Sequence, residues 1–191
     1  AAVDADVQQV IDGNRRVLTD LGCNVETFHP DFSGADEVFQ TLRAWHFAGV
    51  FSQGIEKHPD MYKDTIIWNT QQGQHLTGVD IHDTEVLRTQ VVRRFRAYFE
   101  SYDFLVMPVT QVPPFDITTD WVKEINGVTQ NTYLDWMRSC YWISVTGLPA
   151  ISVPGGFTPE GLPIGLQIVG APQRDLSVLK MAHAFEQATR H

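Results

Sequence analysis

The spacing of apolar positions predicts a first helix close to residue 1. Between residues 6 and 21, apolar side chains recur three or four positions apart: Val7, Val10, Ile11, Val17, Leu18 and Leu21. This spacing places them on one face of a helix. Asp4 or Asp6 can cap its first turn, and Gly22 can adopt the left-handed conformation that ends it. Residues 23–30, which end in a proline, are predicted to form a short strand.

Two further helices are predicted in the middle of the chain. Ser33 followed by Asp36 resembles a capping box, and the apolar positions after it predict a helix that continues to Phe47. Between residues 53 and 77 the periodicity weakens, which indicates short helices and loops. A strongly periodic helix is expected over residues 84–102, capped by Asp83 or Thr84, with its arginines facing outward.

The last part of the chain alternates strands and helices. Residues 104–107 form a short apolar run typical of a buried strand in a parallel sheet. A helix over residues 133–141 follows, then strands over 150–153 and 164–169 joined by a turn, and a final helix capped by Asp175. This alternation predicts an α/β fold. We expect the three strands to share one mixed β-sheet, covered on both faces by helices that include residues 84–102 and 175–189.

Composition and charge exclude several classes of protein. A length of 191 residues is typical of one domain. The net charge of −9 argues against a nucleic-acid or anionic membrane partner. No apolar run approaches the ~20 residues that span a bilayer, and no signal peptide is visible. Cys23 and Cys140 both lie in apolar stretches, so we expect two buried thiols in a reducing, cytoplasmic setting.

The sequence offers no convincing metal, cofactor or nucleophile site. The densest group of potential metal ligands, His75, Asp80, His82 and Asp83, matches no known ligand spacing. The glycines of residues 155–170 flank prolines and strands rather than a helix N-terminus, so a phosphate cradle is not predicted. None of the seven serines stands in a G-x-S-x-G elbow. We therefore expect no metal and no cofactor, and assign no catalytic residue.

Two neighbouring segments form a long and specific pattern. Residues 146–156 read TGLPAISVPGG, and residues 161–170 read GLPIGLQIVG. Together they resemble the C-terminal block of the amidase signature family, which includes amidases and the A subunit of tRNA-dependent amidotransferases. Residues 102–110 resemble the family's strand and loop beside the substrate pocket, and residues 7–28 its helix–strand unit. The resemblance covers essentially the whole chain and is tight over residues 146–188.

The resemblance also implies what residues 1–191 lack. Family members hydrolyse amides with a serine that a second serine and a lysine activate, and all three lie in the N-terminal half. The nucleophile stands in a glycine- and serine-rich segment, and no such run occurs in this sequence. Residues 1–191 therefore resemble the C-terminal portion of an amidase signature domain without its catalytic N-terminal portion. The isolated chain is expected to be inactive.

Four residues are candidates for the substrate side of the pocket. The resemblance places Val109 and Thr110 beside the pocket, and Trp142 in a helix that borders it. Trp142 belongs to an aromatic cluster that would equally suit a protein core. Gln167 offers hydrogen-bond donors and an acceptor in an otherwise apolar strand. It could contact substrate, or it could only satisfy buried main-chain groups. Ser144 departs from the asparagine that many members carry there.

Three functions stay open from the sequence. The chain could be the C-terminal part of an amidase acting on a small-molecule amide, a non-catalytic interaction or scaffold domain derived from the family, or a fragment of a tRNA-dependent amidotransferase A subunit. The acidic balance disfavours direct contact with tRNA. If the N-terminal half is missing, strand edges are left unpaired, so self-association or association with that half is expected.

Overall fold

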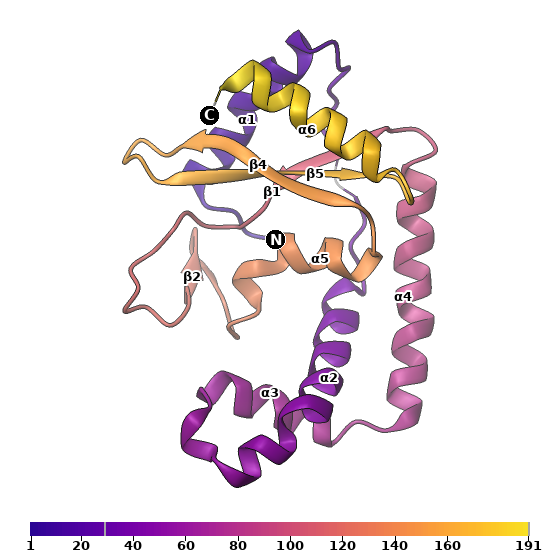
Figure 1. The fold of residues 1–191 in the computed structure, drawn as a ribbon, viewed down its shortest axis with the longest axis vertical. Coiled ribbons are helices and arrows are strands. Elements are labelled where there is room, and N and C mark those ends of the chain that lie inside the picture. Colours follow the sequence, from indigo (N-terminus) through magenta and orange to yellow (C-terminus); the bar gives the residue numbers. More distant parts are fainter. Residues whose placement is uncertain (29, 191) are drawn as a thin grey trace. The chain divides into compact units, whose positions relative to one another are not determined.

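The computed structural model describes residues 1–28 and 30–190 (Figure 1). The chain divides into two compact units. The first combines Ala1–Pro30 with Phe95–His191, and the second is Asp31–Arg94. One boundary falls inside helix α4 (Gly78–Tyr98), which runs through it without a break. The sequence therefore carries no linker signal at this boundary.

The second unit is helical. It contains α2 (Ala35–Lys57), the short 3₁₀ helix η1 (Pro59–Met61), α3 (Asp64–Gln74) and most of α4. Helices α2 and α3 pack so closely that a Cβ at Gly73 would lie 1.9 Å from the carbonyl oxygen of Ala44. Short helices were predicted for residues 53–77, and they are confirmed.

The first unit is built on a three-stranded sheet with the order β1 (Phe104–Pro108), β5 (Pro163–Gly170), β4 (Ala150–Phe157). The prediction that these three segments share a sheet is confirmed. Both pairings are antiparallel, however, so the strands present are not of the predicted parallel or mixed type. The sequence of an apolar strand that is buried on both faces does not reveal whether it pairs in parallel or antiparallel. The short turn between β4 and β5, however, requires an antiparallel pair.

Helices lie on both sides of this sheet, as predicted for the α/β fold (Figure 1). On one side, α1 (Ala5–Asp20) and α6 (Asp175–Thr189) pack against β4 and β5. The core there consists of Leu18, Val153, Leu166, Ile168, Ala182 and Phe185. On the other side lies α5 (Arg138–Thr146), preceded by the 3₁₀ helix η2 (Asp135–Met137). The expected helix over 84–102 belongs mostly to the second unit instead.

Several predicted helix boundaries are wrong. Helix α4 begins at Gly78 rather than near Asp83, and Asp80 in its first turn accepts hydrogen bonds from the backbone N–H and hydroxyl of Thr77. The N-cap of α2 is Gly34, without a side-chain bond, so Ser33 forms no capping box. Residue Arg174 caps α6, and Asp175 is its first residue. Short polar side chains beside a helix start suit several positions equally well, which makes boundaries hard to place.

Two other segments differ from expectation. Residues 23–28 form no strand, because no other strand pairs with them in the described part of the chain, and residue 29 of that prediction lies outside it. The helix expected over 133–141 is displaced toward the C-terminus, as η2 and α5. Strands β2 (Glu124–Ile125) and β3 (Val128–Thr129) form a separate two-stranded hairpin.

Candidate functional site

Val109 follows β1 directly and is held from two sides. Its N–H donates to the carbonyl oxygen of Gly165 on β5 at 3.2 Å. Its own carbonyl oxygen accepts hydrogen bonds from Ser139 Oγ at 2.8 Å and Cys140 Sγ at 2.7 Å, both in the first turn of α5. A Cβ at Gly165 would lie 2.9 Å from Val109 Cγ2, so the glycine leaves room for this approach. The segment after β1 is therefore fixed between β5 and α5.

Thr110 and Trp142 are both half-buried and lie near this junction. The Thr110 hydroxyl donates to the carbonyl oxygen of Val112 at 2.9 Å, which engages it within its own loop. Trp142 belongs to α5 and stands two residues after Cys140. Ser144, one turn beyond Cys140, donates its hydroxyl back to the Cys140 carbonyl oxygen at 3.3 Å. The structure thus brings Val109 against α5, while Thr110 bonds locally.

Gln167 lies in β5, the central strand. Its neighbours Leu166 and Ile168 point into the core beneath α1 and α6, so Gln167 points to the opposite side of the sheet, as does Gly165. The residue is 7% exposed, and its Oε1 atom is buried with no hydrogen-bond partner among the described residues. Nearby main-chain groups therefore do not satisfy this oxygen. Met107 and Ser152 stand opposite Gln167 on the two flanking strands.

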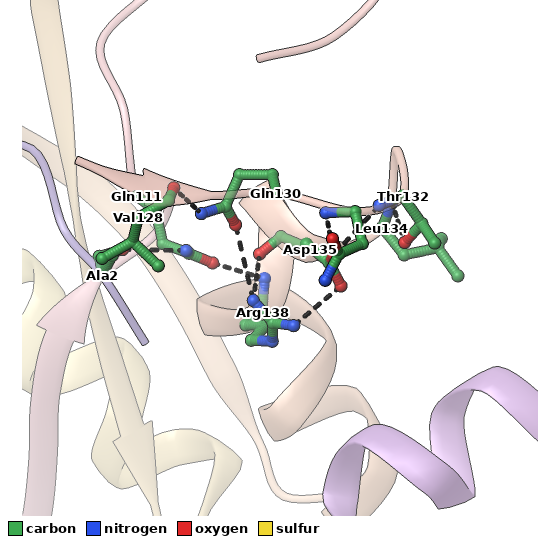
Figure 2. A network of polar contacts seen from close by, with 9 residues as sticks. Ala2, Gln111, Val128, Gln130, Thr132, Leu134, Asp135 and Arg138 are labelled. Carbon is green, nitrogen blue, oxygen red and sulfur yellow. Dashed lines mark hydrogen bonds and ion pairs between the residues drawn. The ribbon is translucent and has the colours of Figure 1, made fainter. Parts of the chain in front are cut away.

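A network of buried polar side chains includes Gln111, which follows Thr110 in the sequence (Figure 2). Gln111 is fully buried, and both ends of its amide are bonded. Its Nε2 donates to the carbonyl oxygen of Ala2 at 2.8 Å, and its Oε1 accepts from the backbone N–H of Arg138 at 2.6 Å. Gln111 thereby joins the first residues of the chain to the start of α5.

Asp135 and Arg138 form the charged part of this network. Asp135 Oδ1 receives Arg138 Nη2 at 2.7 Å, and its Oδ2 accepts the backbone N–H groups of Asn131 and Thr132. Arg138 Nη1 donates to the Asp135 carbonyl oxygen at 3.1 Å and reaches Gln130 Oε1 at 3.4 Å. The Asp135 side chain is 6% exposed, so its charge is compensated almost entirely by these groups.

The sequence did not single out this network. The hydrogen-bond partners of Gln111 lie 109 and 27 positions away along the chain, and no local pattern encodes such a separation. The one available signal is the spacing of Asp135 and Arg138, which allows an ion pair within one helical turn. This pair orders the entry to α5, and with it the residues that hold Val109.

In the described part of the chain, the two thiols and the potential metal ligands do not gather into a second cluster. Cys23 and Cys140 are free and half-buried rather than fully buried. Burial raises the pKa of the Cys140 thiol, with a partly opposing effect from its hydrogen bond to Ser139, so little nucleophilic thiolate forms at neutral pH. Within residues 1–28 and 30–190, no three His, Cys, Asp or Glu side chains gather to hold a metal ion. None of the helices described is long and apolar enough to cross a bilayer.

Comparisons with known proteins agree with the fold. The Amidase family model matches residues 1–179. The A subunit of glutamyl-tRNA(Gln) amidotransferase from Dehalococcoides mccartyi (strain CBDB1) is 39% identical over 103 residues, which are 54% of this chain and 20% of that protein. A putative amidase from Synechocystis sp. is 35% identical over 115 residues, 60% of this chain and 21% of that protein.

Solved structures extend the likeness to the whole chain. A bacterial aryl acylamidase of the amidase signature family superposes with a TM-score of 0.88 and 25% identity, over 100% of this chain and 42% of that protein. An amidase crystal structure superposes with a TM-score of 0.86 and 23% identity, over 97% of this chain and 42% of that protein. This chain thus spans about two fifths of the length of these solved relatives.

Proposed function

This chain belongs to the amidase family, and we propose that it is the C-terminal part of an amide hydrolase of the Ser-Ser-Lys type. The observation that carries the proposal is the superposition of the whole chain on two fifths of an aryl acylamidase. In this proposal residues 1–191 form the C-terminal portion of the amidase signature domain. The nucleophilic serine, its partner serine and the lysine lie in a portion that this chain does not include.

The chain would supply pocket walls and core to that enzyme. Of the four candidates, we propose Val109, Thr110 and Trp142 for the substrate side, and we assign Gln167 to a contact with the polypeptide outside residues 1–191. Val109 is supported by its position directly after β1. Its N–H bonds to Gly165 on β5, and its carbonyl oxygen bonds to the first turn of α5. The substrate would be a small-molecule amide, and the reaction would require no cofactor or metal because serine and lysine supply the nucleophile and the base. We place the protein in the cytoplasm.

A second candidate is a fragment of the A subunit of a tRNA-dependent amidotransferase, favoured by the 39% identity over 103 residues to such a protein. The two functions differ in the fate of the amide nitrogen. A hydrolase releases the nitrogen as free ammonia or amine while water takes the acyl group. An amidotransferase instead passes the nitrogen to an acceptor such as glutamyl-tRNA(Gln). A non-catalytic scaffold derived from the family would do neither.

The test compares this chain with the longer protein that the proposal requires. The reading frame upstream of Ala1 should continue into a lysine and a glycine- and serine-rich segment. The longer protein should hydrolyse simple aryl or alkyl amides and react with a fluorophosphonate probe at one serine. Residues 1–191 alone should do neither, because loss of such a nucleophile costs on the order of 10⁶ in kcat. Activity-dependent labelling of a serine within residues 1–191 would overturn the proposal.

A further inference from the structure

The Gln167 side chain has a polar atom that finds no partner among the described residues of this chain. Oε1 is buried, and none of the described residues donates a hydrogen bond to it. The contrast with Gln111 is direct, because that glutamine is also buried and has both ends of its amide bonded. Nearly all buried polar side-chain atoms in native proteins have a hydrogen-bond partner. A side-chain amide oxygen without one, on a central strand, therefore needs a physical explanation.

The surroundings of Gln167 indicate where a donor can come from. The side of the sheet that carries it is opposite the closed core beneath α1 and α6. On the same side of edge strand β4, Ala150, Ser152 and Pro154 are exposed, and Ser152 stands directly opposite Gln167. Gln167 is thus separated from the surface by a single exposed edge strand. This edge is open to packing by another piece of polypeptide.

We propose that Gln167 Oε1 accepts a hydrogen bond from a backbone N–H or hydroxyl of the polypeptide portion outside residues 1–191, and thereby anchors that portion on the α5 side of the sheet. The inference rests on the proposed function, which requires such a portion. More than half of the superposed aryl acylamidase lies outside the region that this chain covers, so polypeptide is available to fill the position. Gln167 is then a positioning residue rather than a group that touches substrate.

A packed segment is a better donor than a substrate for a geometric reason. The oxygen is enclosed in the chain as it stands, so a donor reaches it only if the Gln167 side chain or the groups that cover it repack. Such repacking happens once when a permanent interface forms. A substrate would require it at every turnover.

The first experiment measures thermal unfolding of residues 1–191 with Gln167→Met, which keeps the side-chain length and removes the amide. Because an unmet buried acceptor destabilises a protein, the midpoint Tm should rise, by about 2–5 °C. The matched control is Gln111→Met, which removes an amide that is bonded at both ends and should lower Tm. If Gln167→Met lowers Tm as Gln111→Met does, Gln167 is satisfied inside the chain and the proposal is wrong.

The second experiment makes the same substitution in the longer protein, where the sign should reverse. Gln167→Met should now lower Tm, because the bond across the interface is lost. A Tm that rises or is unchanged there, with normal activity, would show that no outside segment bonds Gln167. An unchanged Tm with a raised KM for amides would assign the bond to substrate instead. Neither melting measurement depends on catalysis. A longer protein without amidase activity would therefore contradict the proposed function but not the role proposed for Gln167.

Discussion

Asp135 carries a charge in a place that water hardly reaches. Its carboxylate has a 6% exposed side chain and is compensated by Arg138 and by two backbone N–H groups. Taking such a charge out of water is costly, and the cost is met only while all partners are present. The network therefore makes the entry to α5 depend on one cation.

Replacing Arg138 with methionine should expose this dependence. The substitution keeps much of the side-chain bulk but leaves the Asp135 charge buried without its cation. We expect the free energy of unfolding to fall by roughly 2–4 kcal/mol, less than for a fully enclosed pair because the Arg138 side chain is 23% exposed. Urea denaturation of the wild-type and Arg138→Met chains measures this difference in the free energy of unfolding.

The control for this prediction is Arg16→Met. Arg16 pairs with Asp20 at 3.7 Å, with side chains 90% and 72% exposed, so its loss should cost less than about 0.5 kcal/mol. Equal effects of the two substitutions would mean that the buried network contributes nothing beyond a surface pair.

Tyr98 should make the fold less stable as the pH rises into the alkaline range. Burial, and to a smaller extent the neighbouring Tyr102, raises the pKa of Tyr98 to about 12 from the ordinary 10.0. The unfolded chain therefore loses this proton first as pH rises, and stability should fall between pH 10 and about pH 12. Denaturant unfolding at several pH values tests this, and Tyr98→Phe should flatten the decline. A Tyr98 that ionises near pH 10 in absorbance titration would contradict it.

At the scale of residues, the sequence could suggest positions but not their contacts. The resemblance led to Val109 and Gln167, and both lie on the side of the sheet that faces α5. Their partners could not be derived, because Ser139 and Cys140 reach Val109 across 30 and 31 positions of chain. Hydrogen bonds of this kind depend on tertiary packing, which leaves no periodic trace in the sequence.

Among the elements, the contact between α2 and α3 depends on a single glycine. At Gly73 an added Cβ would lie 1.9 Å from the Ala44 carbonyl oxygen and 2.8 Å from the Ala48 Cβ. The obstacle is mainly backbone, which cannot move aside as a flexible side chain can. The close packing of these two helices therefore excludes every other residue type here.

Substituting Gly73 with alanine should force the two helices apart. We expect a loss of about 3 kcal/mol in the free energy of unfolding, near the upper end for overpacking. The control is Gly49→Ala in α2, where nothing lies within 4 Å of the added carbon. It should stabilise the chain by about 0.5–1 kcal/mol, since alanine favours a helix over glycine. Circular dichroism during chemical unfolding measures both, and a neutral Gly73→Ala would refute the tight contact.

Elements with a local signal were predictable, whereas the direction in which strands pair was not. The apolar period and flanking caps of α1 lie within one short segment, and Asp4 does cap it through the backbone N–H of Asp6. Strand direction is different, because β1 and β5 meet across about sixty residues of chain. Likewise residues 23–28 have the composition of a strand, but no strand in the described chain pairs with them.

At the scale of the whole molecule, the three-stranded sheet has two edges on which the described part of the chain places no further strand. Within the described residues β1 and β4 each pair with β5 alone, so one edge of each strand has no pairing strand. Unpaired edges attract further strands, and natural proteins usually cover or shorten them. This chain covers 42% of the solved aryl acylamidase, and under the proposed function the polypeptide outside residues 1–191 would cover these edges.

Residues 1–191 produced alone should therefore associate. Besides the two strand edges, the first unit exposes large apolar side chains, with Phe157 59%, Leu176 64% and Leu179 55% exposed. The net charge of −9 opposes association only weakly, since salt screens surface charges beyond ~8 Å. Size-exclusion chromatography with light scattering should show a mass that rises with concentration. The longer protein, measured in the same way, should show no such rise. A monomer of 21.6 kDa at every concentration that binds no hydrophobic dye would instead favour a self-sufficient scaffold domain.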